Sequence, residues 1–313
     1  MLLFLLFFVF VGLVGVVVYC SHKDIVPISV NYHLTRQCNY SCLFCFHTAT
    51  TSFVLPLDDA KRGLSLLADA GTQKINFAGG EPFLQPLFLG ELCKHAKSSC
   101  GMAVSIVSNG SKITKAWMDR YGEFVDIIAV SCDSFDEVTN IRIGRGKGRH
   151  IETLKKVSGW CKKAGIKFKI NTVVTSLNWQ QDMTKEIMSL DPFRWKVFQV
   201  LLVYGENDGK PGMQDLLISG AKFDDFCDRH AKVLGSVLVK ENNDDMRSSY
   251  LVLDEYMRFL DCSTYEKIPS PSILDVGVQA ALKKSGFDEK TFIGRSGIYD
   301  YRKNDPNPNV LSW

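Results

Sequence analysis

The chain has 313 residues, of which 46% are hydrophobic and 23% are charged, a composition typical of folded globular proteins and not of disordered ones. Its formal net charge of +3 is too small to predict a general affinity for nucleic acid, so no direct nucleic-acid partner is expected. A chain of this length can bury a large core, so its ten cysteines are not needed as a disulfide framework.

The first nineteen residues contain no charged side chain and consist mainly of Leu, Phe, Val and Gly. A helix needs about 20 apolar residues to cross the hydrocarbon core of a bilayer, so this segment is just long enough to insert. A cleaved signal peptide is the alternative, but no Lys or Arg precedes the apolar run. We therefore expect residues 1–26 to be a membrane anchor.

Strand-like and helical patterns alternate after the anchor. We predict strands at 28–34, 74–78, 103–108, 126–131, 167–174 and 195–202. We predict helices near 57–70, 86–97, 114–121, 151–164 and 180–189. This alternation predicts a parallel sheet with crossover helices, arranged either as a partial barrel or as an open doubly wound sheet. In both arrangements the ligand site is expected at the C-terminal ends of the strands.

The pattern changes after residue 204. Residues 205–212 read as a loop, helix-like segments follow near 222–235 and 272–284, and the stretch 301–312 is polar. We therefore divide the catalytic body into a core, residues 27–204, and a C-terminal extension, residues 205–313.

Three cysteines, Cys38, Cys42 and Cys45, directly follow the first predicted strand. Three thiolates can hold three corners of a [4Fe–4S] cluster and leave one iron open to a small-molecule ligand. Structural zinc with His47 as the fourth ligand is the alternative, but such sites usually combine two separated ligand pairs. The spacing therefore favours an iron–sulfur cluster.

The spacing Cys-x3-Cys-x2-Cys, with Phe44 before the last cysteine, resembles that of the radical S-adenosylmethionine (SAM) superfamily, and Gly79-Gly80-Glu81-Pro82 is similar to its glycine-rich turn. The resemblance implies an α/β fold built on a partial (β/α)6 TIM-like barrel, with a [4Fe–4S] cluster and SAM as cofactors. Glycines let the backbone approach a bound amino acid closely, and Glu81 can accept a hydrogen bond from its ammonium group. The SAM contacts implied by the resemblance are Gly79, Gly80, Glu81, Ser108, Asn109 and Ser131.

Polar residues recur two positions apart on three predicted strands, and residues with this spacing share one face of a strand. The pairs are Lys74 and Asn76, Lys169 and Asn171, and Arg194 and Lys196. Solvated faces are the alternative, since exposed Lys and Arg are common. Three pairs on the strands of one covered sheet favour an inward-facing cationic cluster, for which a triphosphate is the natural ligand.

Within the superfamily, residues 39–57, 74–83, 131–135, 194–198 and 249–260 resemble the viperin family. By this resemblance the triphosphate contacts are Lys74, Asn76, Arg145, Lys169, Asn171, Arg194 and Lys196. A C-terminal segment that carries Tyr250, Lys267 and Arg295 is implied to close over the nucleotide.

The resemblance also implies a reaction. CTP would lose the hydrogen at ribose C4′ to a 5′-deoxyadenosyl radical and then lose water, which gives 3′-deoxy-3′,4′-didehydro-CTP for antiviral defence. No catalytic side chain is expected beyond the cluster ligands. Two alternatives stay open: the same chemistry on UTP or another nucleoside triphosphate, and a non-catalytic membrane-associated interaction protein.

A cytosolic location follows from the chemistry of the predicted cluster, because a labile iron–sulfur centre belongs in a reducing compartment. The resemblance implies the cytoplasmic face of the endoplasmic reticulum membrane and lipid droplets. The anchor is apolar all round, whereas viperins carry an amphipathic helix there. The last residues, Leu311-Ser312-Trp313, resemble the signal read by the cytosolic iron–sulfur assembly targeting complex, so this complex is a predicted partner through Trp313.

Overall fold

The computed structural model describes residues 25–303 of the chain. The first 24 residues of the predicted anchor and the predicted Trp313 signal lie outside the described residues. Within residues 25–303, no helix combines the length and the apolar character required to cross a bilayer.

All six predicted core strands are present. They are β1 (Ser29–His33), β2 (Lys74–Ala78), β3 (Ala103–Ser108), β4 (Ile127–Ser131), β5 (Lys167–Val174) and β6 (Arg194–Gln199). The last of them ends three residues before the predicted Leu202. Its apolar continuation leaves the sheet because Val200 packs against Cys42 and Phe44 of the cysteine loop.

The core strands are parallel and lie side by side in chain order, from β1 to β6. A doubly wound sheet would reverse this order at a switch point, so the arrangement is of the barrel type. The complete sheet has ten strands in the order β10-β9-β8-β1-β2-β3-β4-β5-β6-β7 and stays open, with β10 and β7 at its edges. The predicted partial barrel is therefore confirmed.

Four strands of this sheet come from the C-terminal extension, and sequence periodicity did not predict them. They are β7 (Leu238–Glu241), β8 (Leu251–Leu253), β9 (Arg258–Asp261) and β10 (Ile268–Ser272). Strand β7 pairs with β6 and β8 pairs with β1, both in parallel, so the extension adds strands at both edges of the core sheet. These strands have only three to five residues each, too few for a clear periodic signal.

The predicted helices of the core are α1 (Leu57–Asp69), α2 (Pro86–Lys94), α3 (Lys115–Tyr121), α5 (His150–Lys163) and α6 (Thr184–Leu190). The sequence did not predict α4 (Glu137–Ile143), a short helix capped by the Asp136 carboxylate, which accepts from the backbone N–H groups of Val138 and Thr139.

In the extension, α7 (Gly220–Leu234) agrees with the prediction, and the two short helices α8 (Asn243–Met246) and α11 (Glu289–Gly294) are additional. The predicted helix 272–284 is instead two pieces, α9 (Ile273–Val276) and α10 (Val278–Leu282). They are separated by Gly277, whose φ of 79° is incompatible with a continuous helix.

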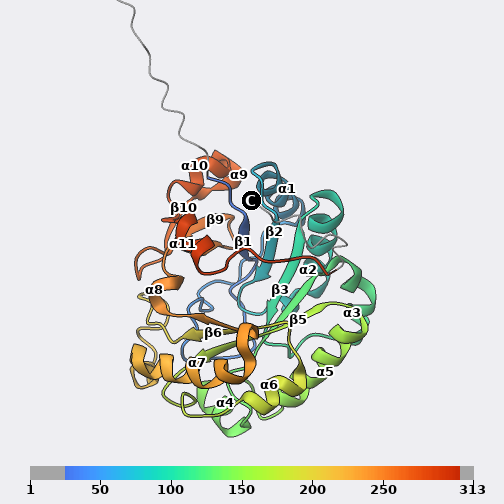
Figure 1. Cartoon of the computed structure of the whole chain (residues 1–313). Helices are drawn as coiled ribbons and strands as arrows, with labels where there is room; N and C mark the ends of the chain where they lie inside the picture. Colours follow the sequence, from blue (N-terminus) through green and yellow to red (C-terminus); the bar gives the residue numbers. More distant parts are fainter. Residues whose placement is uncertain (1–24, 304–313) are drawn as a thin grey trace, which may run out of the picture.

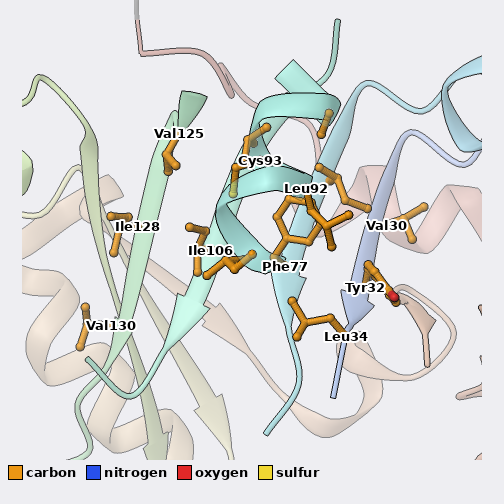
Figure 2. Close-up of a cluster of buried hydrophobic side chains, with 14 of the residues drawn as sticks. Val30, Tyr32, Leu34, Phe77, Leu92, Cys93, Ile106, Val125, Ile128 and Val130 are labelled. Carbon is orange, nitrogen blue, oxygen red and sulfur yellow. The ribbon is translucent and has the colours of Figure 1, made fainter. Parts of the chain in front are cut away.

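The two faces of the sheet have opposite character. Val30 and Tyr32 of β1, and Leu34 just after it, point outward and pack with Phe77, Ile106 and the helix residues Leu92 and Cys93 (Figure 2). The helices cover this outer face (Figure 1). Since side chains alternate along a strand, the polar pairs recognised in the sequence must point to the other side, into the interior of the open barrel.

Candidate active site

The inward face of the sheet surrounds a cavity of about 360 Å³. All the predicted site residues line it except Glu81 and Arg194. The cavity extends beyond the C-terminal ends of the strands, where we expected it, because Lys74, which lines it, is the first residue of β2. It therefore spans the whole length of the sheet, with the cysteines at one end and a group of cations at the other.

Residues 35–37, which lead into the cysteine loop (residues 38–45), are held against the glycine-rich turn by backbone contacts. The N–H of Gly80 donates to the carbonyl of Thr35 (2.7 Å), and the N–H of Glu81 donates to that of Gln37 (2.7 Å). A Cβ atom on Gly79 would lie 2.3 Å from the Thr35 oxygen, and one on Gly80 would lie 2.0 Å from the Gln37 oxygen. The close packing of the two loops therefore requires glycine at both positions, independently of any bound ligand.

The three cysteine thiols line the cavity together, and each has a defined environment. The sulfur of Cys38 accepts from the Tyr40 N–H (3.4 Å), and those of Cys42 and Cys45 face the carbonyl oxygens of Gly144 (3.6 Å) and His47 (3.4 Å). Burial raises the pKa of the Cys42 thiol to about 12, so iron binding there would displace a proton. Three convergent sulfurs with a solvent-shielded backbone fit an iron–sulfur cluster.

The alternative zinc site is not supported by the geometry. Within residues 25–303, no three His, Cys, Asp or Glu side chains lie close enough together to hold a single metal ion. The His47 ring packs edge-on against His33, with ring centroids 4.3 Å apart, and does not join the thiols in lining the cavity. His47 is therefore not placed as a fourth ligand, and the three thiols match the ligand number of a [4Fe–4S] cluster with one open iron.

The Glu81 carboxylate is fully buried beneath the cavity wall. One oxygen accepts from Ser108 Oγ (2.8 Å) and the Phe83 N–H (3.0 Å), and the other accepts from the Asn109 N–H (2.7 Å). Burial raises the pKa of this carboxyl to about 7 despite these hydrogen bonds. Glu81 thus ties the glycine-rich turn to the end of β3, and its predicted contact with the ammonium group of SAM stays a prediction.

Side chains at the ends of β3 and β4 complete the cysteine end of the cavity. The Asn109 amide donates to Asn39 Oδ1 (3.0 Å), so it joins the end of β3 to the cysteine loop. Ser131 lines the cavity, and its carbonyl is hydrogen-bonded to His150 Nε2 (2.7 Å). The predicted SAM residues therefore surround the space next to the thiols.

Arg145 also lies at the cysteine end, away from the other predicted triphosphate contacts. Its Nε donates to the buried carboxylate of Asp133 (2.7 Å), and its guanidinium lies 5.6 Å from the Phe44 ring centroid. Although burial opposes the charged form, Asp133 and the nearby Cys42 raise the pKa of Arg145. The charge of Arg145 is thus largely balanced by Asp133, and the structure separates it from the cations at the opposite end.

The opposite end of the cavity holds four buried cations, as the strand pairs predicted. Pairing of β5 with β6 places Lys169 beside Arg194 and Asn171 beside Lys196. The fourth cation, Lys74, lies on β2. The exposed fractions of Lys74, Lys169, Arg194 and Lys196 are only 5–9%. The alternative of solvated faces is therefore wrong.

The cations of this cluster are buried close to one another, so both burial and mutual repulsion oppose their charged forms. Burial, together with the neighbouring cations, lowers the pKa of Lys74, Lys169 and Lys196 to about 7 from 10.5. The ammonium of Lys169 makes no hydrogen bond or ion pair within residues 25–303. Burying a charged ammonium without a partner lowers the stability of the folded protein, unless an anion binds beside it.

One carboxylate, Glu241 at the end of β7, lies in the cluster. It contacts the Lys196 ammonium, and Arg295 Nη1 donates to it (3.2 Å). Lys196 also donates to Tyr250 Oη (2.9 Å), and the Arg295 guanidinium lies 3.9 Å from the Tyr250 ring centroid. Tyr250 and Arg295, which the viperin resemblance named, therefore lie within the cationic cluster, and their contact with a nucleotide stays a prediction.

Gly297 and Tyr299 line this end of the cavity. The segment 297–303 to which they belong crosses the central strands of the sheet (Figure 1). Tyr299 Oη accepts from Lys74 Nζ (3.1 Å), and the Arg194 guanidinium lies 4.3 Å from the Tyr299 ring centroid. Beyond it, Arg302 donates to the Gly101 carbonyl (2.7 Å) and the Lys303 N–H donates to Asp126 (3.1 Å). Aromatic faces thus shield the cations from water.

Lys267 lies apart from the cluster, at the rim near the cysteine loop. Its ammonium contacts the Phe46 carbonyl and lies 3.4 Å from a carboxylate oxygen of Glu206, which also pairs with Arg36 (3.0 Å). The predicted triphosphate residues therefore fall into three groups: the cationic cluster, Arg145 with Asp133, and Lys267 with Glu206.

Sequence reasoning missed three residues that shape the cavity: Asp133, Glu241 and Tyr299. Glu241 and Tyr299 come from segments without a motif, whereas Asp133 lies in the stretch 131–135 that resembles the viperin family, and each meets its partner only through the tertiary fold. For Asp133 a signal was present, since it follows the predicted strand that ends at Ser131. For Glu241 and Tyr299 the sequence carries no comparable signal.

The comparisons with known proteins agree with this site. The family model of the radical SAM superfamily matches residues 32–190. The S-adenosylmethionine-dependent nucleotide dehydratase RSAD2 of Oncorhynchus mykiss is 54% identical over 293 residues, which are 91% of this chain and 84% of that protein. The RSAD2 of Danio rerio is 55% identical, covering 89% and 79%, and a bacterial nucleotide dehydratase of Flammeovirga pacifica is 37% identical, covering 90% and 98%.

Solved structures of lower sequence identity share the fold. The enzyme anSMEcpe with bound AdoMet and a peptide superposes with a TM-score of 0.65 at 16% identity, covering 84% of this chain and 83% of that one. Identity at this level establishes the architecture alone. The family model and the close relatives establish more: the chain belongs to the radical SAM superfamily and, within it, to the viperin family of S-adenosylmethionine-dependent nucleotide dehydratases.

Proposed function

We propose that this chain removes water from CTP to give 3′-deoxy-3′,4′-didehydro-CTP, by SAM-dependent radical chemistry at ribose C4′, in antiviral defence. One observation carries the proposal: a single cavity joins three convergent thiols at one end to a buried cationic cluster at the other. The relatives support the reaction class, since they are named nucleotide dehydratases.

The dimensions of the cavity suit an extended nucleotide. Gly79 directly follows β2 and lies five residues after Lys74, which corresponds to roughly 16 Å of extended chain. With the triphosphate on the cationic cluster, the ribose would point toward the thiols and the predicted SAM contacts. Such an arrangement brings the reacting groups together by positioning.

The cofactors would be held at the thiol end. Cys38, Cys42 and Cys45 would bind the [4Fe–4S] cluster, and Gly79, Gly80, Ser108, Asn109 and Ser131 would contact SAM. Together these groups supply one-electron reduction of SAM and the 5′-deoxyadenosyl radical that abstracts hydrogen. The protein contributes orientation and exclusion of water.

At the phosphate end, the chain itself binds and neutralises the ligand. Arg194 and Arg295 can each give two parallel hydrogen bonds to phosphate oxygens, and Lys74, Lys169 and Lys196 act as point charges. Asn76 and Asn171 lie two residues beyond Lys74 and Lys169 on the same strands, toward the thiol end, where they would contact the ribose side of the triphosphate. The Tyr299 ring faces Arg194 and the Tyr250 ring faces Lys196, and these aromatic faces would keep water away from the charges.

The choice of CTP rests on the viperin resemblance, and the experiment must test it against other bases. The full chain would be purified anaerobically in detergent, reconstituted with iron and sulfide, and mixed with dithionite, SAM and each of four nucleoside triphosphates. We expect 5′-deoxyadenosine to form rapidly only with CTP, alongside a product lighter by one water. Equal rates with UTP would assign the same chemistry to a broader substrate range.

The cluster assignment is tested with Cys42→Ala. We expect this variant to lose the brown absorbance of the cluster and all SAM cleavage. A matched Cys161→Ala variant, which removes a buried thiol of α5 far from the loop, should retain both. SAM cleavage by Cys42→Ala would contradict the ligand set. If the wild-type protein holds an intact cluster but cleaves no SAM with any of the four nucleotides, the non-catalytic alternative would be favoured.

We also propose that the N-terminal segment holds the protein on the cytoplasmic face of the endoplasmic reticulum and on lipid droplets, and that Trp313 binds the cytosolic iron–sulfur assembly targeting complex. The apolar composition of residues 1–19 and the terminal Leu-Ser-Trp support these proposals. Fractionation of cells expressing the full chain and a chain lacking residues 1–26 tests the first. Iron content of Trp313→Ala expressed in the same cells tests the second.

A further inference from the structure

A second hollow opens on the outer surface beside the cysteine loop. Four basic side chains, Lys112, Lys147, Arg149 and Lys156, line it together with a single acidic one, Glu152. Glu152 pairs with Arg149 (3.1 Å) and with Lys156 (2.6 Å). The ammonium groups of Lys112 and Lys147 make no ion pair within residues 25–303, so the groove keeps an uncompensated positive charge.

This basic groove and the cavity share one lining residue, Tyr40. It stands between Cys38 and Cys42 in the cysteine loop. Its backbone N–H donates to the Cys38 sulfur (3.4 Å), and its ring lies against Gly146 of the basic loop 144–149. Tyr40 therefore connects the surface of the groove to the cysteine loop.

An exposed apolar patch adjoins the groove. Val138 and Ile141 on α4 are 65% and 50% exposed, and the Ile141 side chain lies beside Gly148 of the basic loop. The helix is tied directly to the cysteine loop, because the Leu43 N–H donates to the Ile143 carbonyl (3.0 Å). Apolar side chains beside a basic groove are the composition of a protein-binding surface with a charged rim.

We propose that the basic groove together with Val138 and Ile141 is the docking surface for an acidic one-electron carrier protein. This inference rests on the proposed function, which needs one electron for each SAM cleaved. In the docked complex the carrier would be oxidised by one electron and the cluster reduced by one, with no bond made or broken. Transfer would pass through Tyr40 and the cysteine loop.

Charge complementarity identifies the partner. An acidic surface would be steered toward the uncompensated Lys112 and Lys147, and the association rate would fall as salt is added. Electron-transfer encounters also bury little area, below about 1,200 Å² in total, so a small groove with two apolar residues is sufficient. An anionic membrane surface could be attracted by the same charges, and the experiment separates the two.

The test compares two electron donors on the reconstituted full chain with SAM and CTP. Dithionite needs no docking surface, whereas flavodoxin, reduced by NADPH and its reductase, is an acidic carrier protein. The variant is Lys112→Glu with Lys147→Glu, and its matched control is Lys162→Glu with Lys163→Glu at the far end of α5. Both double variants change the net charge equally and involve exposed lysines.

We expect the groove variant to form 5′-deoxyadenosine about tenfold more slowly with flavodoxin at low salt, and at an unchanged rate with dithionite. The control variant should match the wild type with both donors. Loss of the dithionite-driven reaction in the groove variant would overturn the proposal, as would an undiminished flavodoxin rate. Weaker binding to phosphatidylserine vesicles with an unchanged flavodoxin rate would assign the groove to the membrane instead. Failure of the wild type with dithionite would contradict the proposed function itself.

Discussion

The Glu241 carboxylate contacts the Lys196 ammonium deep in the cavity, and both side chains are almost completely shielded from water. Although burial acts to raise it, Lys196 and Arg295 lower the pKa of this carboxyl, so Glu241 is ionised at neutral pH. Glu241 thus supplies an internal negative charge to a cluster that otherwise consists of cations, from a buried position behind the cavity lining.

Glu241→Gln should lower the free energy of unfolding of the ligand-free protein by about 3 kcal/mol, because removing one partner leaves a buried charge unpaired. A triphosphate would restore the missing negative charge, so CTP should stabilise the variant more than the wild type. Thermal unfolding with and without CTP measures both effects. Glu289→Gln, at an exposed position, serves as the control, and a smaller CTP-induced shift in Glu241→Gln would contradict this role.

Lys169→Met should stabilise the protein and abolish nucleotide binding. The buried ammonium of Lys169 has no partner within the described residues, whereas a thioether of similar length buries without cost. We expect the unfolding free energy to rise by about 2 kcal/mol. Lys185→Met on the surface of α6 should change it by less than about 0.5 kcal/mol. Chemical denaturation and isothermal titration with CTP check the two parts, and CTP affinity retained by Lys169→Met would show that this lysine is not a phosphate contact.

The stability of the ligand-free protein should rise with pH above neutrality. Lys74, Lys169 and Lys196 have folded-state pKa values of about 7 against 10.5 when unfolded, so the unfolded chain binds more protons between these limits. The unfolding free energy should therefore increase between pH 7 and pH 8.5, by up to about 1.4 kcal/mol per pH unit for each lysine.

Saturating CTP should abolish this increase, because a bound triphosphate keeps the three lysines protonated. The binding reaction should take up protons at pH 8, and the affinity should fall as pH rises from 7. Calorimetric titrations in buffers of different ionisation enthalpy measure the proton uptake. Binding without uptake at pH 8 would place the triphosphate elsewhere.

Gly80→Ala should prevent stable cluster assembly, although it changes no metal ligand. Its Cβ would lie 2.0 Å from the Gln37 carbonyl oxygen, so the cysteine loop would have to move away from the glycine-rich turn. We expect less bound iron and sulfide after reconstitution and loss of SAM cleavage. Gly159→Ala on α5, where the added Cβ meets no atom within 4 Å, should retain full iron content. An unaltered cluster in Gly80→Ala would show that the two loops can separate without loss of the site.

The sequence alone determined the features that depend on local geometry. Cysteines three and four positions apart are close along the chain and so share one loop. Polar residues two positions apart on a strand share one face, because side chains alternate between the two faces of the sheet. The six core strands, the thiol set and the inward direction of Lys74, Lys169, Arg194 and Lys196 therefore followed from spacing.

Only the tertiary structure decided which residues meet these groups and how far the cavity extends. Glu241 reaches Lys196 across 45 residues of chain, and Tyr299 reaches Lys74 across 225, because short strands and a terminal segment return to the sheet from the extension. Such contacts are set by the pairing of distant segments, and no local repeat encodes them. The same long-range pairing separated Arg145 from the cations with which the sequence had grouped it and placed the basic groove beside the cysteine loop.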